Sequence, residues 1–377
     1  MNRRAFLQWS AAAPLVGWLP QTALASSKQQ RVLVLVKLSG GNDGFNTLIP
    51  HADPLYYSLR PTLAIPRHQV IDTGQGMGVN PYLKTLKPWW DAGQMAWVQG
   101  VGYPHGDLSH FRSNDIWETA STAPSAPEQG WLAQTLAARN GLHGIVMGEQ
   151  LGPLLGKNCN ALAMQSPAVF LSQVGLVEDI APTNVTPALA HLTRTQHKLY
   201  AAGQQLESKL RKPAALGVPF STSALGRDLE SVAQMILSGV NASVYLVTQE
   251  GFDTHSNQVV AHSNLLHHLA GGLDSFARAM QRGGRWNDVV LMTYSEFGRR
   301  PQENRGKGTD HGTASAQLLL GGRVRGGIYG DAPALHELDA NGNPQQTVDF
   351  RKVYGTLAQQ WLGLQNPWGK FGTLPLV

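Results

Sequence analysis

Polar side chains gather in one stretch of the sequence, between two short apolar runs. The stretch covers residues 287–322, and the apolar runs are residues 289–293 and 314–320. The side chains between these runs that could do chemistry are Glu296, Arg299, Arg300, Glu303, Asp310 and His311. Carboxylates and imidazoles are ligands of metal ions, and arginine binds anionic groups through its planar fork of donors. The stretch therefore predicts a site for a metal ion together with an anion.

Three further polar clusters follow apolar runs that predict buried strands. They are Asp43 after residues 31–38, Ser109 after residues 95–101, and Asp253 with His255 after residues 243–249. In open α/β sheets the carboxyl ends of the strands converge in space, and ligands bind at that edge. Carboxylate oxygens and imidazoles together suit zinc or manganese, or calcium if carboxylates dominate. We therefore expect the four clusters to meet around one or two divalent ions.

Several of these residues also have a purely structural interpretation. Asp43 could form an Asx turn or cap a helix, and Ser109 could be an N-cap instead of a nucleophile. Arg299 and Arg300 could form a surface ion pair with Glu303 instead of binding an anion. The residue types alone leave both interpretations open.

The apolar runs predict an α/β fold in which a mostly parallel, doubly wound sheet is covered by helices. Short continuous runs rich in Val and Leu are typical of strands buried on both faces. Residues 262–281 predict a helix with a core-facing stripe. The stripe consists of Leu265, Leu269, Leu273, Phe276 and Met280. Residues 187–240 predict further helices that cover the sheet or cap its edge, and we expect residues 31–377 to form a single domain.

The first residues predict an export signal. Arg3 and Arg4 precede a modest apolar run, and small residues up to Ala25 suit cleavage after that position. Paired arginines are typical of twin-arginine export, with an ordinary secretory signal as the alternative. We expect residues 1–25 to be removed and the mature chain to be periplasmic or secreted. No later apolar run reaches the roughly 20 residues that a membrane span needs.

Charge and cysteine content exclude some classes of partner and site. The formal net charge is +5, and Arg3 and Arg4 account for two of these charges, which leaves +3 on the mature chain. This excess is too small to indicate a nucleic-acid partner. The single cysteine, Cys159, excludes an internal disulfide and a cysteine-rich metal site. The oligomeric state stays open.

Several short motifs, taken together, resemble one family. They are the paired-arginine leader, GGNDGFN, DLSHF, GFDTH, SEFGR and GTDHG. They resemble the exported bacterial family known as domain of unknown function 1501, which is grouped with the alkaline phosphatase and sulfatase-like superfamily. The resemblance covers essentially the whole mature chain. It implies a three-layer α/β/α sandwich of the alkaline phosphatase-like kind.

The resemblance also implies roles for individual residues. Asp43 is similar to the aspartate that binds metal beside the nucleophile, and Ser109 falls where the nucleophile would be. Asp253 and His255 resemble the Asp/His pair of one metal site, although they are more tightly spaced. His311 resembles the late histidine that precedes a strand and a glycine-rich turn.

The sequence departs from the superfamily after residues 289–293. An Asp-His pair is usual there, whereas this chain has Glu296 followed by Phe297, which cannot bind metal. In another alignment Asp310 and His311 take that role, which leaves only His336 as the late histidine. Either alignment lacks one ligand of a two-metal site, so the resemblance is compatible with one ion or with two.

These observations together imply a metal-dependent hydrolase that acts on small phosphate or sulfate esters. The expected metal ligands are Asp43, Asp253, His255, Glu296, Asp310 and His311. The ion would lower the pKa of Ser109 or of a bound water. Arg299 and Arg112 would stabilise negative charge on the substrate. The alternative is a non-catalytic periplasmic binding or assembly protein with a degraded metal site.

Overall fold

The computed structural model describes residues 30–121, 127–137, 141–175 and 186–377. Within them, Arg31–Val377 form one compact unit. The expected signal segment, residues 1–25, lies outside the described residues. No helix in the described part of the chain is both long and apolar enough to cross a membrane.

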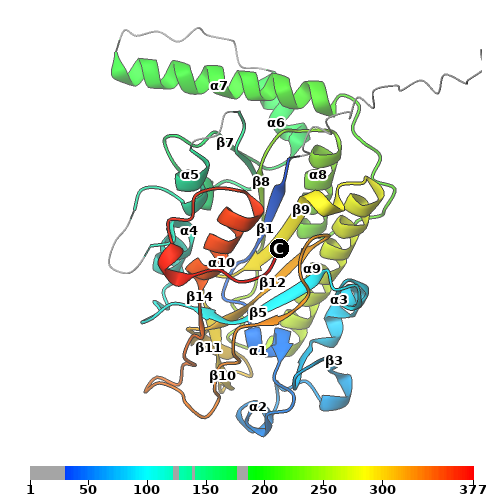
Figure 1. Cartoon of the computed structure of the whole chain (residues 1–377), viewed down its shortest axis with the longest axis vertical. Coiled ribbons are helices and arrows are strands. Elements are labelled where there is room, and N and C mark those ends of the chain that lie inside the picture. The colour runs from blue at the N-terminus through cyan, green and yellow to red at the C-terminus, as the bar shows by residue number, and fades with distance from the viewer. Residues whose placement is uncertain (1–29, 122–126, 138–140, 176–185) are drawn as a thin grey trace, which may run out of the picture. The chain divides into compact units, whose positions relative to one another are not determined.

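A nine-stranded sheet forms the centre of this unit (Figure 1). The strand order is β13-β5-β12-β9-β1-β8-β6-β7, and β14 pairs with β5. The bounds are β1 (Val32–Leu38), β5 (Met95–Gly102), β6 (Gly144–Met147), β7 (Ala161–Met164), β8 (Val244–Gln249), β9 (Val289–Tyr294), β12 (Ser315–Gly321), β13 (Gly327–Tyr329) and β14 (Val348–Asp349). Every described pairing in this sheet is parallel except those of β12. The predicted mostly parallel sheet is confirmed.

Strand β12 runs against its neighbours because of the path that the chain takes to reach it. After β9 the chain forms an antiparallel hairpin, β10 (Gly298–Glu303) with β11 (Thr309–Gly312). The hairpin returns the chain to the edge where β9 ended, so the next strand has to run back. To run parallel to β9, the next strand would have to start where β9 starts, and the chain would need a crossover connection to return there. The apolar run 314–320 is thus a buried strand, as predicted, but its pairing with β9 and β5 is antiparallel.

Two hydrophobic cores lie on the two faces of the sheet. Alternate residues of β1 divide between them, with Val34 and Val36 on one face and Leu33 and Leu35 on the other. Helices α8 (Ala224–Leu237) and α9 (Gln258–Arg282) cover the first face, and α4 (His110–Thr119), α5 (Trp131–Leu136) and α10 (Phe350–Thr356) cover the second (Figure 1). The three-layer α/β/α sandwich is therefore confirmed.

The helix expected at residues 262–281 is α9, which begins four residues earlier and ends one residue later. Its stripe faces the core as expected: Leu269, Leu273, Phe276 and Met280 are buried in it, and Leu265 is partly buried and packs against it. The region 187–240 holds α7 (Pro187–Leu210) and α8. Helix α8 belongs to the core layer itself, and α7 packs against α6 (Pro167–Val174) and α8.

Smaller elements fill the connections. They are α1 (Gly44–Thr47), β2 (Leu48–Ile49), α2 (Pro54–Leu59), β3 (Ile71–Gly74), β4 (Met77–Val79), α3 (Lys87–Asp91), a π-helical turn at Leu357–Trp361, and 3₁₀ turns at Arg67–Gln69, Pro81–Leu86, Gly152–Leu154, Trp286–Asp288 and Gly369–Phe371. Strands β2, β4 and β3 form a separate small sheet. Asp349 is the N-cap of α10, and its carboxylate accepts a hydrogen bond from the Arg351 N–H at 2.9 Å. This is the structural role expected of an aspartate at a helix start.

Candidate metal centre

Side chains from three connections meet beyond the carboxyl ends of β5, β8 and β9. His110 is the first residue of α4, Asp253 follows β8, and His311 lies in β11. One ligand atom from each of these residues lies within 4.8 Å of the other two. Two imidazoles and a carboxylate form a donor set typical of zinc sites. These three residues are the candidate metal centre.

The Nδ1 atoms of His110 and His311, which face away from Asp253, each form a hydrogen bond that orients the ring. His311 Nδ1 lies 2.8 Å from the Leu108 carbonyl oxygen, and His110 Nδ1 lies 2.9 Å from Glu296 Oε1. Because both partners are acceptors, each Nδ1 carries the proton and donates it. The Nε2 atom of each neutral ring is then a lone-pair donor, as in metal-bound histidines backed by an acceptor. These Nε2 atoms lie 3.1 Å (His311) and 3.5 Å (His110) from the carboxylate oxygens of Asp253.

A third histidine lies against the same group. His255 Nε2 is 2.9 Å from His311 Nε2 and 3.0 Å from Asp253 Oδ1. Two imidazole lone pairs at this separation repel each other unless a proton or a metal ion lies between them. A cation near these nitrogens would relieve the repulsion, which makes His255 a candidate fourth donor beside the three residues of the centre.

The protonation states favoured by the surroundings suit metal binding. Burial raises the pKa of Asp253, but the hydrogen bond from Arg299 and the contacts with the neighbouring histidines outweigh it and lower that pKa to about 2. The carboxylate is therefore ionised at ordinary pH. Burial lowers the pKa of His311, which favours the neutral ring that a metal needs.

Arg299 is fully buried, and its donors are bonded inside the protein. Its partners are the carbonyl oxygens of Gly41 (2.7 Å), Thr309 (2.8 Å), Phe252 (3.2 Å) and Gly40, and Asp253 Oδ1 (2.7 Å). The side chain expected to bind a substrate anion thus joins the loops after β1 and β8 to the β10–β11 hairpin. It also fixes the carboxylate of Asp253.

Asp43 does not join the cluster, although it follows β1 as expected. Its side chain is fully buried, and Oδ1 caps α1 by accepting from the N–H groups of Phe45 (3.1 Å) and Asn46 (3.3 Å). Its Oδ2 lies 2.6 Å from Arg60 Nη1 and also accepts from Gln258 Nε2. Burial raises the pKa of Asp43, but Arg60 outweighs it and holds the pKa below its usual value. The capping interpretation describes this residue, because α1 and Arg60 occupy its oxygens.

Glu296 and Asp310 contact the cluster from outside. Glu296 is 1% exposed, and its Oε1 accepts from the Gly40 N–H at 2.8 Å as well as from His110. Asp310 Oδ1 lies 3.7 Å from His255 Nδ1, and Oδ2 lies 3.7 Å from Arg300 Nη1. Both carboxylates therefore support histidines, and neither lies between the converging Nε2 atoms.

Ser109 precedes α4 at the N-cap position, but its hydroxyl makes no capping bond. The residue is exposed and lies between Leu108, whose carbonyl orients His311, and His110. Its backbone N–H is held by Asp107 Oδ1 at 2.8 Å. One turn later, Arg112 Nη1 lies 4.0 Å from Asp115 Oδ2.

Sequence reasoning missed His110. The motif DLSHF contains it, but the serine before it drew attention as a nucleophile. The position of His110 in the sequence could have indicated it. A residue at the start of a helix that follows a buried strand lies near the carboxyl ends of the strands, where ligands bind.

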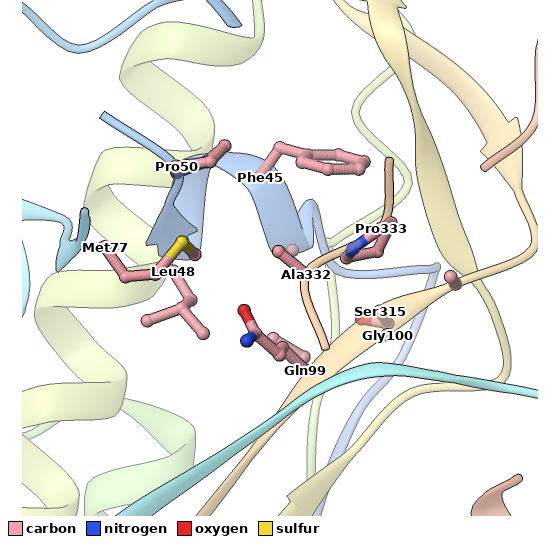
Figure 2. A pocket seen from close by; sticks show the side chains of 12 residues that line it. Phe45, Leu48, Pro50, Met77, Gln99, Gly100, Ser315, Ala332 and Pro333 are labelled. Carbon is pink, nitrogen blue, oxygen red and sulfur yellow. The ribbon is translucent and has the colours of Figure 1, made fainter. Parts of the chain in front are cut away.

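A small crevice lies apart from these residues, between α1, β5 and the start of β12. Figure 2 shows Phe45, Leu48 and Met77 on its apolar walls, with the amide of Gln99 among them. The cavity volume is about 30 Å³, and none of the histidines or carboxylates described above lines it.

Comparison with known proteins gives a partial match. A family model described as "Protein of unknown function (DUF1501)" matches residues 230–368, which include Asp253, His255 and His311 but not His110 or Ser109. No curated protein matches the chain.

Several solved structures show a distant likeness. The lipoteichoic acid synthase LtaP from Listeria monocytogenes has a TM-score of 0.41 at 8% identity, with 90% of this chain and 74% of that chain covered. A protein in the alkaline phosphatase superfamily from Vibrio parahaemolyticus has a TM-score of 0.40 at 9% identity (89% and 68%). A phosphonate monoester hydrolase of Agrobacterium radiobacter has 0.36 at 9% identity (92% and 78%). The description of the fold rests on the strand order and layers given above.

A buried histidine near this region makes stability depend on pH. His262 Nε2 lies 2.9 Å from Asn42 Oδ1, and burial lowers the pKa of His262 to about 4. Between about pH 6.5 and 4 the unfolded chain binds a proton that the folded chain does not, so the free energy of unfolding falls as pH falls. We expect this histidine to cost about 2 kcal/mol at pH 5 relative to pH 8.

Urea unfolding of the wild type and of His262→Gln at pH 8 and pH 5 tests this expectation. The variant should lose less stability on acidification than the wild type. The matched control is His267→Gln, which changes an exposed histidine of the same helix and should behave as the wild type. An equal loss in all three proteins would contradict it.

Proposed function

We propose that the chain is a periplasmic metal-dependent hydrolase of phosphate or sulfate esters that uses one divalent ion, zinc or manganese. The observation that carries this proposal is the convergence of donors: the Nε2 atoms of His110, His255 and His311 all point at the carboxylate of Asp253. The internal bonds of Asp43 favour one ion over two. The paired arginines at the start of the sequence support export.

The roles of the residues follow from their contacts. His110, Asp253 and His311 hold the ion, and His255 supplies the fourth donor. When bound, the ion would polarise an ester oxygen and lower the pKa of a nearby hydroxyl or water. Ser109 is the proposed nucleophile because the residue is exposed, its side chain makes no capping bond, and it directly precedes His110.

The proposed reaction has two steps. The Ser109 oxygen attacks phosphorus or sulfur, the bond to the substrate's alcohol oxygen breaks, and the alcohol leaves with the proton that the hydroxyl loses. Water then cleaves the serine ester, releases phosphate or sulfate and restores the hydroxyl. Arg299 acts in this scheme as a positioning residue, since its hydrogen bonds hold Asp253 and join the loops after β1 and β8 to the β10–β11 hairpin.

Ser109→Ala tests the nucleophile. We expect hydrolysis of aryl phosphates or sulfates by the metal-loaded mature chain to fall at least about a hundredfold, because the covalent step is lost. Metal content, measured by atomic emission, should not change. Ser208→Ala alters an exposed serine of α7 and is the matched control. Full activity in Ser109→Ala would assign the attack to water.

The same assay separates this proposal from the second candidate, a non-catalytic binding or assembly protein. The internal ion pair of Asp43 favours that candidate, because it removes one carboxylate from the centre. Tight metal binding without turnover of any ester would support it. Absence of metal binding would contradict the proposed hydrolase.

Glu296→Gln tests the support behind His110. Glutamine keeps the shape of the side chain and an oxygen that accepts from the Gly40 N–H. It removes the negative charge that makes Nε2 of His110 a stronger metal ligand. We expect the affinity for zinc to fall about 10- to 100-fold, measured by competition with a chelating dye. Glu303→Gln is the control, because Glu303 in the same hairpin bonds to Thr62 and Leu63 instead. If Glu296→Gln and Glu303→Gln bind zinc equally well, Glu296 does not support metal binding by His110.

A further inference from the structure

The turn between β10 and β11, residues 304–308, carries two exposed cations, Arg305 and Lys307. We call it the basic turn. It is held in one conformation by Asn304, whose Oδ1 accepts from the N–H groups of Gly306 (2.9 Å) and Gly308 (3.1 Å). The Asn304 N–H donates to the Gly308 carbonyl at 2.8 Å. The two cationic side chains therefore project from a fixed backbone.

The basic turn packs directly on the loop that carries His255. Asn304 Nδ2 donates to the His255 carbonyl and to Asp310 Oδ1, both at 3.0 Å. The Asn257 N–H donates to the Gly306 carbonyl at 3.0 Å. A side chain on Gly306 or Gly308 would meet the His255 backbone, so this approach requires glycine at both positions. The backbone that carries Arg305 and Lys307 thus packs against His255, whose imidazole contacts the candidate metal centre.

The acidic groups around the basic turn are engaged elsewhere. Glu303 accepts from the N–H groups of Thr62 (2.8 Å) and Leu63 (3.0 Å), and Asp310 lies near Arg300 and His255. Within the described residues, neither Arg305 nor Lys307 forms an ion pair with a carboxylate. Two cations without acidic partners attract an anion at the edge of the site.

We propose that the substrate carries a second anionic group on its alcohol part, and that Arg305 and Lys307 bind this group while the ester lies at the metal centre. This inference rests on the proposed function and narrows it to esters with at least two anionic groups. The guanidinium of Arg305 offers a bidentate fork to a phosphate, sulfate or carboxylate. Lys307 adds a second charge from the same rigid backbone.

The test compares an aryl phosphate with the corresponding aryl bisphosphate. At low salt we expect the zinc-loaded protein to prefer the bisphosphate about tenfold in kcat/KM, through a lower KM. The double variant Arg305→Gln/Lys307→Gln should lose this preference and keep its kcat on the monophosphate. About 0.5 M salt should weaken the wild-type preference, because exposed charges are screened.

The matched control removes the same number of charges far from the site. Lys209→Gln/Lys212→Gln alters two exposed lysines, one in the last turn of α7 and one just after it, and Figure 1 shows α7 at the opposite end of the sheet from β10 and β11. This control should keep the preference. An equal loss in both double variants would overturn the inference, since net charge alone would then explain it.

Binding of non-hydrolysable analogues separates failure of the inference from failure of the proposed function. Calorimetry with an aryl bisphosphonate and an aryl monophosphonate should show the same tenfold preference, lost only in the variant of the basic turn. If esters are hydrolysed but the wild type shows no preference for either bis-anionic compound, the inference is overturned and the hydrolase stands. If the analogues show the preference while no ester is hydrolysed, the anion site stands and the hydrolase fails.

Discussion

His311→Ala should lower the affinity of the protein for zinc by more than about a hundredfold, and ester hydrolysis should fall with it. Loss of a supporting residue typically costs 10- to 100-fold in metal affinity, and His311 is itself one of three central donors. Its removal also leaves His255 Nε2 without its closest ring partner. The measurement is zinc affinity by competition with a chelating dye, combined with the hydrolysis rate at saturating zinc.

The control for this result is His268→Ala, which removes an exposed histidine of α9 outside the cluster. It should bind zinc and turn over substrate as the wild type does. Wild-type zinc affinity in His311→Ala would show that the ion binds elsewhere, and the proposed centre would then be abandoned. If affinity falls but the activity at saturating zinc does not, His311 holds the ion without being needed for the reaction.

Arg299→Met should lower the free energy of unfolding by about 3–5 kcal/mol, because several buried carbonyl oxygens lose their donor at about 1–3 kcal/mol each. The substitution leaves the carbonyl oxygens of Gly41 and Thr309 without their donor and removes the partner of Asp253. Each buried acceptor left without a donor carries a cost of its own. Urea unfolding of the metal-free mature chain measures the change without interference from bound zinc.

Arg300→Met is the matched control, because Arg300 is the next residue of the same strand but is partly exposed. Its ion pair with Asp310 spans 3.7 Å, and partly exposed pairs contribute about 1 kcal/mol or less. If both variants lose a similar free energy of unfolding, the buried hydrogen bonds of Arg299 do not stabilise the fold as proposed. A large loss in Arg299→Met alone would explain why this side chain is unavailable to a substrate.

The layers of the fold could be predicted from local patterns because burial leaves a local trace in a sequence. Continuous apolar runs such as residues 31–38 mark strands covered on both faces, and the stripe in residues 262–281 marks one buried helix face. The direction of β12 left no such trace. An apolar strand looks the same in either direction, and only the hairpin before it decides which way it runs.

The location of the candidate site could be predicted from the sequence, but the set of residues that form it could not. Asp253, His255 and His311 follow predicted strands and do meet, because the carboxyl ends of the strands share one edge. His110 went unnoticed because a single histidine in a helix start has no diagnostic spacing. The six expected metal ligands therefore divide into three that converge and three that serve elsewhere.

Strand ends and residue types are local properties, so the pattern of residues indicates which chemical groups follow each strand. The roles of those groups depend on the contacts that form in the folded protein. Asp43 and Asp253 are both aspartates that follow a strand, yet Arg60 and the N–H groups of α1 occupy the first, while the second faces three imidazoles. The difference lies in partners distant along the chain, which compete for the same oxygens once the protein has folded.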